Sequence, residues 1–583
     1  MAAPPSLSRS VITILLLLNL AFRLGAALQP IEHVDSIAFP DDTYLCLSIS
    51  RSIAEGNGPS YSGEFTNGFQ PLYVYLMAPA FMLFPQDDII PIRIAVVMLS
   101  LFDTLTLLLL LSLVMAVTRA AAVPLIIAAA WIINPAGITT AINGMETSVA
   151  SFMLLMMLWV YHRFTAAGDP LTDRRSLLLG LVFGLGVFAR IDAVMLAGAL
   201  TVMIIWRSRS VPAAALRTAL LIAAGAAVTY GPWFVYSWMN SGDLFPVSGK
   251  AIRFMELDRA ENVLIGSTWY RHTVTSALTA IFRNNAAVLI IISVLLFPAA
   301  ALLSGMRERL RVHGPMMFPL FLVAGTLYTV HVAVVLNSFA TFRVIQPFSI
   351  ITIVLGSSVY IPFLLYGSEL GAVLRRHAML VVPLLLFAAG LFIGYAYYIF
   401  GVWFFPRYLF PVGIVALVVA ALVLDVLVRS LHGVKFRRLL FAFIILVIGG
   451  VNIGANQLPM LYTPTPEASN GYMKIGLWAK EQFREGTVIG SCQSGALGYF
   501  ARQCRVVNLD GVVNKRCFEA LQAGTIPAFL RSERIDYVIG WPLNMAFLSR
   551  RSDTPLMGHL SPVKDVPDIV SWSSNWVYYQ VFR

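Results

Sequence analysis

Charged residues are scarce in this chain, and long hydrophobic runs take their place. Charged residues make up 12% and hydrophobic residues 58% of the 583 positions, and the mean hydropathy is +0.77. This composition excludes a soluble globular protein, in which about 25% of residues are charged. The apolar runs are continuous rather than alternating, so a membrane β-barrel is excluded as well. The sequence therefore predicts an α-helical polytopic membrane protein.

Cysteine and histidine are also rare, with four and eight copies. No Cys-x-x-Cys or Cys/His spacing is present, which excludes the usual structural metal sites. Cys492 and Cys504 flank a loop between two predicted strands in a part of the chain that is expected to be exported. They are the best candidates for a disulfide, because disulfides persist outside the cytoplasm. Cys46 is expected to be a buried helix residue.

Negative charge is the scarcer sign, and the net charge of +11 would fit an acidic partner such as nucleic acid. The positions of the basic residues indicate topology instead, because they recur in every second connection between apolar runs. These residues are Arg119, Arg163, Arg174, Arg175, Arg207, Arg209, Arg217, Arg307, Arg309, Arg311, Arg375, Arg376, Arg429, Lys435, Arg437 and Arg438. The alternation predicts about thirteen spans in the plasma (inner) membrane, a cytoplasmic N-terminus, an exported C-terminus and no nucleic-acid partner.

The first apolar segment, residues 11–28, is interpreted as a retained span. A cleaved signal peptide is the alternative, although Asn19 and Arg23 within the run fit it poorly. Either interpretation makes residues 29–90 an exported loop. Within that loop, segment 71–85 is too short to cross the bilayer and is expected to be an interfacial or re-entrant helix.

Hydropathy falls near residue 457, which divides the chain into a membrane domain, 1–456, and an exported domain, 457–583. A second exported loop is expected at 239–284. In the C-terminal domain, TVIGSC, RVVNLDG and RIDYVIG predict short buried strands, and 471–484 and 515–531 predict helices. The pattern is that of a soluble α/β domain, large enough to hold its own core.

Two adjacent carboxylates, Asp41 and Asp42, open a polar segment just outside the first span. Ionisable groups at a membrane face are costly and usually functional. One aspartate could act as a general base toward an acceptor hydroxyl. The other could help hold a divalent cation such as Mg²⁺ or Mn²⁺, or stabilise a cationic sugar centre. Helix capping is the alternative, because Pro-Asp-Asp is also a good helix N-terminus.

Five more ionisable residues map to the same face. Glu146 in NGMET begins a span, and Arg190 and Asp192 in FARIDA lie at an outer turn. A helix-dipole cap and a local salt bridge are the respective alternatives to substrate binding. Lys250 and Arg407 add cations that could neutralise a phosphate leaving group. For Arg407, in the aromatic stretch WFFPRYLFP, membrane anchoring is the alternative.

Seven motifs occur in an order that resembles one bacterial group of proteins. They are DDTYLCLSISRSIAEGNGP, NGFQPLY, NGMET, FARID, GDLFPVSGKA, PRYLFP and NLDGVVN, and the resemblance that they carry extends over almost the whole chain. The set resembles membrane glycosyltransferases of the GT-C fold, the group of aminoarabinose transferases and protein O-mannosyltransferases. Its arabinofuranosyltransferase-like branch is the most similar.

The resemblance implies a sugar donor linked to polyprenyl phosphate, an active site on the exported face and a glycan, lipid or protein acceptor. It assigns the catalytic base to Asp41, with Asp42 second, and matches Glu146, Lys250 and Arg407 to the family's conserved acid, lysine and arginine. An inverting pentosyl- or hexosyltransferase is the expected function, with no cofactor other than a divalent cation. Two rival functions are a polytopic lipid or polysaccharide transporter (flippase) and a non-enzymatic binding protein that uses its exported tail.

Overall fold

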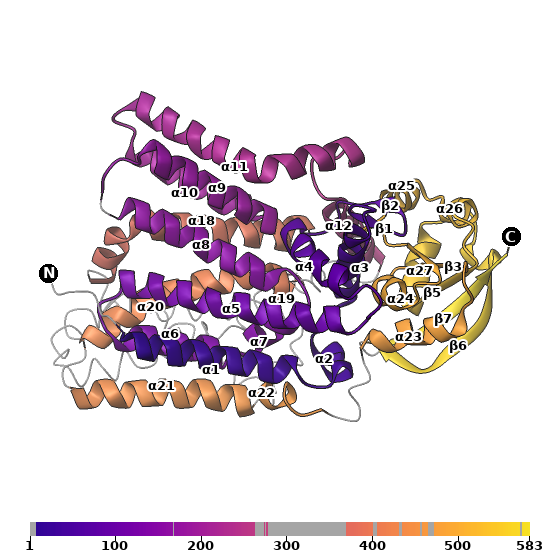
Figure 1. Ribbon diagram of the computed structural model, residues 1–583, viewed down its shortest axis with the longest axis horizontal. Helices are drawn as coiled ribbons and strands as arrows, with labels where there is room; N and C mark the ends of the chain where they lie inside the picture. Colours follow the sequence, from indigo (N-terminus) through magenta and orange to yellow (C-terminus); the bar gives the residue numbers. More distant parts are fainter. Residues whose placement is uncertain are drawn as a thin grey trace, which may run out of the picture.

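The computed structural model describes residues 7–262, apart from 167, and 369–582, apart from 400–404, 431–433, 455–456, 465–470 and 572–573, together with 273, 276 and 277. A bundle of long helices forms most of the molecule, and an α/β unit lies at one end of it (Figure 1). The predicted loop 239–284 falls partly outside the described residues.

The bundle consists of apolar helices that run back and forth between its two ends, roughly along the horizontal axis of the view (Figure 1). Its members are α1 (Arg9–Ala27), α5 (Ile90–Val117), α6 (Ala122–Ile132), α7 (Pro135–Ile142), α8 (Thr147–Thr165), α9 (Asp173–Ala189), α10 (Ala193–Arg207), α11 (Pro212–Ser241), α18 (Ala378–Ile393), α20 (Phe410–Ser430) and α21 (Val434–Gly454). The short elements η1 (Gly394–Ile399), α19 (Phe405–Tyr408) and α22 (Gln457–Met460) lie between or after them.

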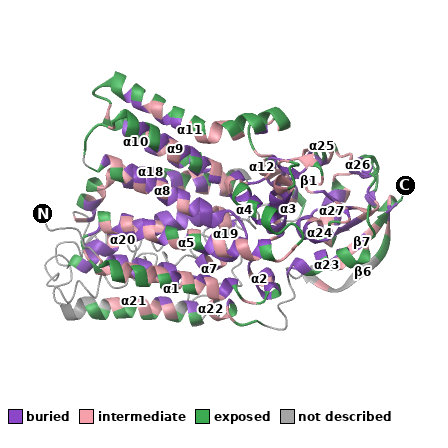
Figure 2. Ribbon diagram, in the orientation of Figure 1, coloured by how far each residue is buried: buried purple, intermediate pink, exposed green. Residues whose placement is uncertain are grey.

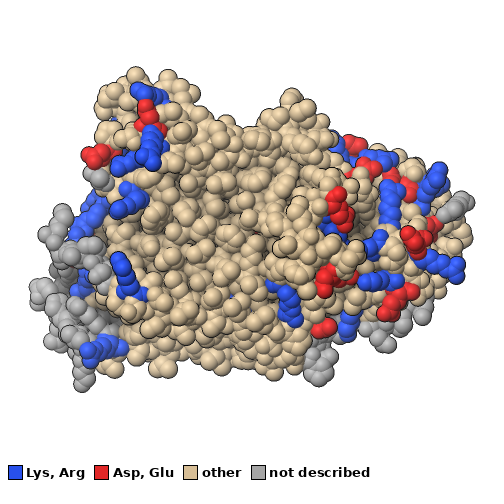
Figure 3. Space-filling view, in the orientation of Figure 1, with Lys and Arg blue, Asp and Glu red and all other residues tan. Residues whose placement is uncertain are grey.

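Five of the described helices are long and apolar enough to cross a membrane, and the pair α6 and α7, bent by 57°, would make a sixth. A multi-pass membrane protein is therefore confirmed, whereas the figure of about thirteen spans stays a prediction. Figure 3 shows an almost uncharged belt between two charged ends. Arg163 and Arg207 lie in the last turns of α8 and α10, at the end of the bundle away from the α/β unit.

The chain between α1 and α5 folds over the opposite end of the bundle. It forms α2 (Ile31–Ala38), α3 (Asp41–Ala54), the hairpin of β1 (Ser60–Tyr61) and β2 (Glu64–Phe65), and α4 (Pro71–Leu83). With 13 residues α4 is too short to span a bilayer, and it packs against α3, α5 and α9. Cys46 is buried on α3, as predicted.

The α/β unit contains a five-stranded sheet of order β4-β3-β5-β7-β6, in which β3, β4 and β5 are parallel and β7 and β6 are antiparallel. Its elements are α23 (Met473–Gln482), β3 (Val488–Ser491), α24 (Gly495–Phe500), β4 (Arg505–Asn508), α25 (Lys515–Ala523), α26 (Ile526–Ser532), β5 (Tyr537–Gly540), α27 (Pro542–Arg550), η3 (Leu556–Gly558), β6 (Leu560–Ser571) and β7 (Ser574–Val581). The three predicted strands are confirmed, while β6 and β7 have no counterpart in the prediction.

The α/β unit and the bundle end share one hydrophobic core rather than meeting at a polar surface. A single buried cluster joins residues of α2 to α5 with residues of α23, α24 and β7 (Figure 2). Tyr44 and Tyr499, for example, lie with ring centroids 5.5 Å apart across the junction. The carboxylate of Asp35 accepts the Met473 amide at 2.8 Å, and Asp88 pairs with Arg502 at 2.5 Å. The α/β unit therefore does not move freely on the bundle end.

The disulfide prediction is wrong. Cys492 and Cys504 are both free and buried in the structure. Cys492 packs in the core of the sheet with Cys517, whereas Cys504 belongs to the core shared with the bundle end. The two thiols therefore serve as small apolar residues in two separate cores.

Candidate functional site

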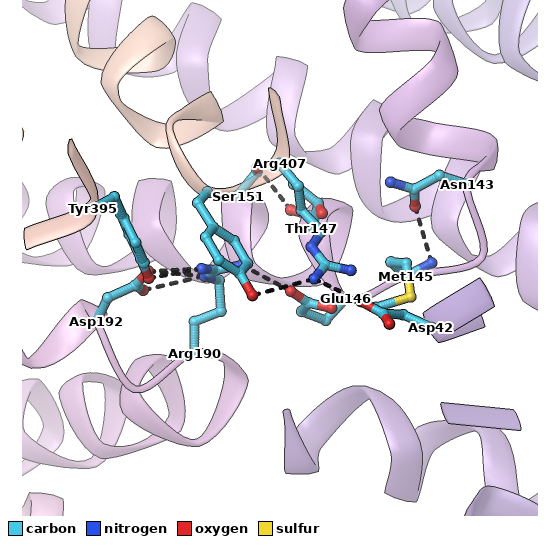
Figure 4. A network of polar contacts seen from close by, with 11 residues as sticks. Asp42, Asn143, Met145, Glu146, Thr147, Ser151, Arg190, Asp192, Tyr395 and Arg407 are labelled. Atoms are coloured by element: carbon cyan, nitrogen blue, oxygen red, sulfur yellow. Dashed lines mark hydrogen bonds and ion pairs between the residues drawn. The ribbon is translucent and has the colours of Figure 1, made fainter. Parts of the chain in front are cut away.

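A cluster of charged side chains lies at the bundle end that the α/β unit covers. Asp42 begins α3, Glu146 precedes α8, and Arg190 and Asp192 lie between α9 and α10. Arg407, on α19, enters from the second half of the chain. Figure 4 shows their side chains pointing toward one another, with Tyr395 of η1 among them. These residues, together with Tyr408, are called the charge cluster below.

Asp42 and Arg407 form the accessible part of the charge cluster. Arg407 Nη2 lies 3.0 Å from Asp42 Oδ2. The Arg407 side chain is 12% exposed and the Asp42 side chain is 26% exposed. The same Nη2 lies 3.4 Å from the Tyr408 hydroxyl. A partly exposed carboxylate can accept a proton from a bound hydroxyl group.

Glu146, Arg190 and Asp192 form the buried part of the charge cluster. Arg190 Nη1 lies 2.7 Å from Glu146 Oε1, and Arg190 Nη2 lies 2.8 Å from Asp192 Oδ2. Tyr395 donates its hydroxyl to Asp192 Oδ2 at 2.6 Å. All three charged residues are buried. A buried ion pair needs such hydrogen bonding to offset desolvation, and Arg190 also contacts the Tyr408 ring on which Arg407 lies, which connects this part to Arg407.

The loop that carries Glu146 is fixed against the start of α3. Thr43 donates its hydroxyl to the Asn143 carbonyl at 2.6 Å, and Tyr73 donates to the Gly144 carbonyl at 2.6 Å. Gly144 has a φ of +66°, and a Cβ there would collide with Thr43 Cγ2. Only glycine permits both that backbone and that approach, which explains the glycine in NGMET.

Asp41 points away from the charge cluster, toward the α/β unit. Its two carboxylate oxygens accept the backbone amides of Gly495 and Ala496 at 2.8 and 3.0 Å. A Cβ on Gly495 would collide with the Asp41 carbonyl oxygen, so the two backbones touch. Burial raises the pKa of Asp41 from 3.8 to about 7, although the two amide hydrogen bonds oppose that shift. Asp41 therefore joins α3 to the first turn of α24.

Lys250 and Arg23 are not part of the charge cluster. Lys250 lies on α12 (Val247–Asn262) and pairs with Asp243 at 2.5 Å, and none of its described hydrogen bonds or ion pairs reaches Arg407. Arg23 is buried at the break between α6 and α7, where it pairs with Asp103 at 2.7 Å and donates to two backbone carbonyls. Both therefore have clear structural partners.

The residues proposed for a divalent cation do not fit one. Both oxygens of Asp41 are engaged by amides, and Asp42 is paired with Arg407. In the part of the chain that the structure describes, no group of three or more His, Cys, Asp or Glu side chains is arranged to hold a metal.

Tyr395 and Tyr408 belong to the site but were not predicted from the sequence. Their rings lie 4.7 Å apart, and both Arg190 and Arg407 lie 5.0 Å from the Tyr408 ring. Tyr408 directly follows Arg407 in the PRYLFP motif, so proximity in sequence could have found it. Tyr395 lies in an apolar stretch with no polar pattern around it, and only the fold brings it to Asp192.

One family model matches the chain, a domain of unknown function (DUF8728) at residues 462–582. This match covers the α/β unit, and the description of the family names no activity. No curated protein matches the chain.

Solved structures give a clearer likeness. The archaeal oligosaccharyltransferase AglB from Archaeoglobus fulgidus, in complex with an inhibitory peptide and a dolichol-phosphate, is 13% identical with a TM-score of 0.52, over 95% of this chain and 72% of that chain. The oligosaccharyltransferase of the same organism in complex with Zn and sulfate is 14% identical with a TM-score of 0.53, over 98% and 73%.

ArnT from Cupriavidus metallidurans bound to undecaprenyl phosphate is a weaker likeness, at 13% identity and a TM-score of 0.48 over 98% of both chains. The two oligosaccharyltransferase likenesses show that this chain shares the fold of those proteins. The mostly helical part of the predicted fold class is thereby confirmed, whereas the number of spans stays a prediction. The arabinofuranosyltransferase-like branch stays a prediction.

Proposed function

We propose that this protein is a membrane glycosyltransferase that transfers a sugar from a polyprenyl-phosphate-linked donor to a hydroxyl of a glycan, lipid or protein acceptor. The observation that carries the proposal is the Asp42–Arg407 pair, which sets a carboxylate beside a cation at the end of the bundle. The shared fold supports the reaction class, and the dolichol-phosphate bound in the similar AglB structure supports a lipid-linked donor.

Asp42 is the proposed general base, in preference to Asp41. A base needs an accessible carboxylate oxygen, and both oxygens of Asp41 already accept backbone amides. Asp42 takes the proton of the acceptor hydroxyl, whose oxygen forms the new bond to the anomeric carbon. The bond from that carbon to the phosphate oxygen breaks, and the electron pair leaves with the polyprenyl phosphate. Attack opposite the departing phosphate inverts the anomeric configuration.

Arg407 is the proposed phosphate-binding cation. Its guanidinium lies within reach of Asp42 and can exchange that partner for the donor phosphate, because arginine binds both groups through the same planar donors. Glu146, Arg190 and Asp192 hold Arg407 and Tyr408 in place and are positioning residues in this scheme. Lys250 would bind phosphate only after leaving Asp243.

The proposed orientation puts the charge cluster and the α/β unit on the exported side of the inner membrane. Arg163 and Arg207, in the last turns of α8 and α10, and Arg217, in the second turn of α11, lie at the opposite side of the bundle. Basic residues concentrate in cytoplasmic connections, which supports this orientation. Lipid-linked donors can then reach the site from the outer leaflet.

The test is sugar transfer from a panel of radiolabelled polyprenyl-phosphate sugars, with Asp42→Asn beside the wild type. A general base contributes about 10²–10⁴-fold in rate, so Asp42→Asn should lose transfer by at least about 100-fold. Asp553→Asn, which changes an exposed carboxylate of the α/β unit, is the matched control and should keep full activity. Full transfer by Asp42→Asn would refute the mechanism. No release of polyprenyl phosphate from any donor would favour the transporter.

A further inference from the structure

The carboxyl edge of the parallel strands of the α/β unit lies next to α3. The central strand β3 is flanked by β4 on one side and by β5 on the other. The connection after β3 therefore leads to one side of it, and the connection after β4 leads to the opposite side. In open α/β sheets, ligands bind outside the carboxyl ends of the strands at this switch point. The loop after β3 touches α3 directly, because Gly495 and Ala496 donate to Asp41.

The loop after β4 brings a third acid toward the two acids of α3. Asp510 is partly buried, and its carboxylate accepts the Val512 amide at 2.9 Å. Burial raises its pKa to about 7, although its hydrogen bonds to the Val512 amide and to the Asn508 side chain oppose that shift. Gly68, on the loop after β2, lies against the same turn, where a Cβ would collide with the Val512 carbonyl oxygen.

Two polar atoms at this edge are buried without a hydrogen-bond partner among the described residues. Asn508, at the end of β4, is fully buried, and its Nδ2 donates to Ser494 Oγ at 3.0 Å while its Oδ1 is unpaired. Trp541, directly after β5, leaves its Nε1 unpaired. Buried polar atoms are nearly always paired, so an unpaired acceptor and donor at one sheet edge indicate a bound polar group.

An aromatic pair completes the surroundings. Tyr472 stacks on Trp541, with ring centroids 6.2 Å apart and planes inclined by 25°. Tyr472 directly precedes Met473, whose amide donates to Asp35 of α2 at 2.8 Å, so this pair lies beside the bundle end. The edge thus offers a carboxylate, an amide acceptor, an indole donor and aromatic rings.

We propose that this sheet edge binds a carbohydrate acceptor and presents one of its hydroxyls to Asp42. The inference rests on the proposed glycosyl transfer and names the acceptor class. Sugar hydroxyls donate and accept at once, which suits the acceptors Asp510 and Asn508 and the donor Trp541. The C–H faces of a sugar ring pack on aromatic side chains, which suits Trp541, the half-buried member of the Tyr472–Trp541 pair. A lipid alkyl acceptor would leave Asn508 Oδ1 and Trp541 Nε1 unpaired.

The test measures binding by isothermal titration of the full-length protein in detergent. The probes are short pentofuranose and hexopyranose oligosaccharides, a serine-containing peptide and a long-chain alcohol. At least one oligosaccharide should bind, and Asp510→Asn and Trp541→Phe should each weaken it at least tenfold. Trp541→Phe removes the N–H and keeps an aromatic ring on Tyr472. The matched controls Asp553→Asn and Trp478→Phe, with Trp478 packed on Phe483, should bind as the wild type does.

Two results would overturn the inference. One is the absence of oligosaccharide binding at millimolar concentration, or binding only of the peptide or the alcohol. The other is oligosaccharide binding that changes less than threefold in both variants. Asp42→Asn separates this inference from the proposed function, because it should lose transfer and keep oligosaccharide binding. Binding that survives while no donor is turned over by the wild type would refute the transferase and leave a carbohydrate-binding protein.

Discussion

Asp41→Asn should loosen the contact between α3 and α24 without removing the general base. The Asp41 carboxylate accepts the amides of Gly495 and Ala496 at 2.8 and 3.0 Å, and the asparagine amide group can accept only one of them. A buried donor left without a partner costs about 1–3 kcal/mol. At about 1.4 kcal/mol per factor of ten, the opening equilibrium of α24 should rise about 5- to 150-fold.

Hydrogen exchange of the full-length protein measures this opening. Amides of α24 in Asp41→Asn should lose protection by that factor, whereas amides of α26, which lies in the separate core of the sheet, should keep theirs. Transfer at saturating substrates should fall much less than in Asp42→Asn. Unchanged protection of α24 together with a loss of transfer of 100-fold or more would refute this reasoning and identify Asp41 as the base.

Four further outcomes are expected. Glu146→Gln should lower the free energy of unfolding in detergent by about 3 kcal/mol, because it leaves part of the buried charge of Arg190 unpaired. An unchanged melting temperature would contradict this. Asp258→Asn should raise hydrogen exchange in α12, since Asp258 accepts Arg550 and Arg551 at 2.6 Å each; an effect confined to α27 would argue against it. The pKa of Asp41 is raised from 3.8 to about 7, so its stabilising contribution is complete below pH 3.8 and is lost as the pH rises through about 7. Protection of α24, corrected for intrinsic exchange, should therefore decline over that range in the wild type and change little in Asp41→Asn. Transfer should persist in EDTA, because Arg407 supplies the positive charge beside Asp42; complete loss that Mg²⁺ restores would disprove this.

Composition and periodicity determined the class of the protein. Low charge and long apolar runs require a lipid-facing bundle, because no water is available in a bilayer to hydrogen-bond an exposed backbone. The three strands of the α/β unit were also predictable, since each is a short apolar run next to turn residues. The strands β6 and β7 were missed because polar residues and Pro562 interrupt their sequences, and pairing with β5 stabilises β7 nonetheless.

Most of the charge cluster is also predictable from the sequence alone. The alternation of apolar runs assigns five of its members to one face, and these are Asp42, Glu146, Arg190, Asp192 and Arg407. An even number of spans between two segments returns the chain to the same side of a membrane, so topology alone brings such residues to one end. It does not bring them into contact, and Lys250 shares the face without joining the cluster.

Only the tertiary structure distinguished the two neighbouring aspartates. Consecutive residues on a helix point about 100° apart, because a turn takes about 3.6 residues. Helix geometry sets that divergence but not what lies in each direction. In the folded protein, Asp41 faces the Gly495 amide of α24, which lies 454 residues further along the chain. Asp42 faces Arg407, which lies 365 residues further along. Two identical side chains therefore acquire different roles from partners that local sequence cannot reveal.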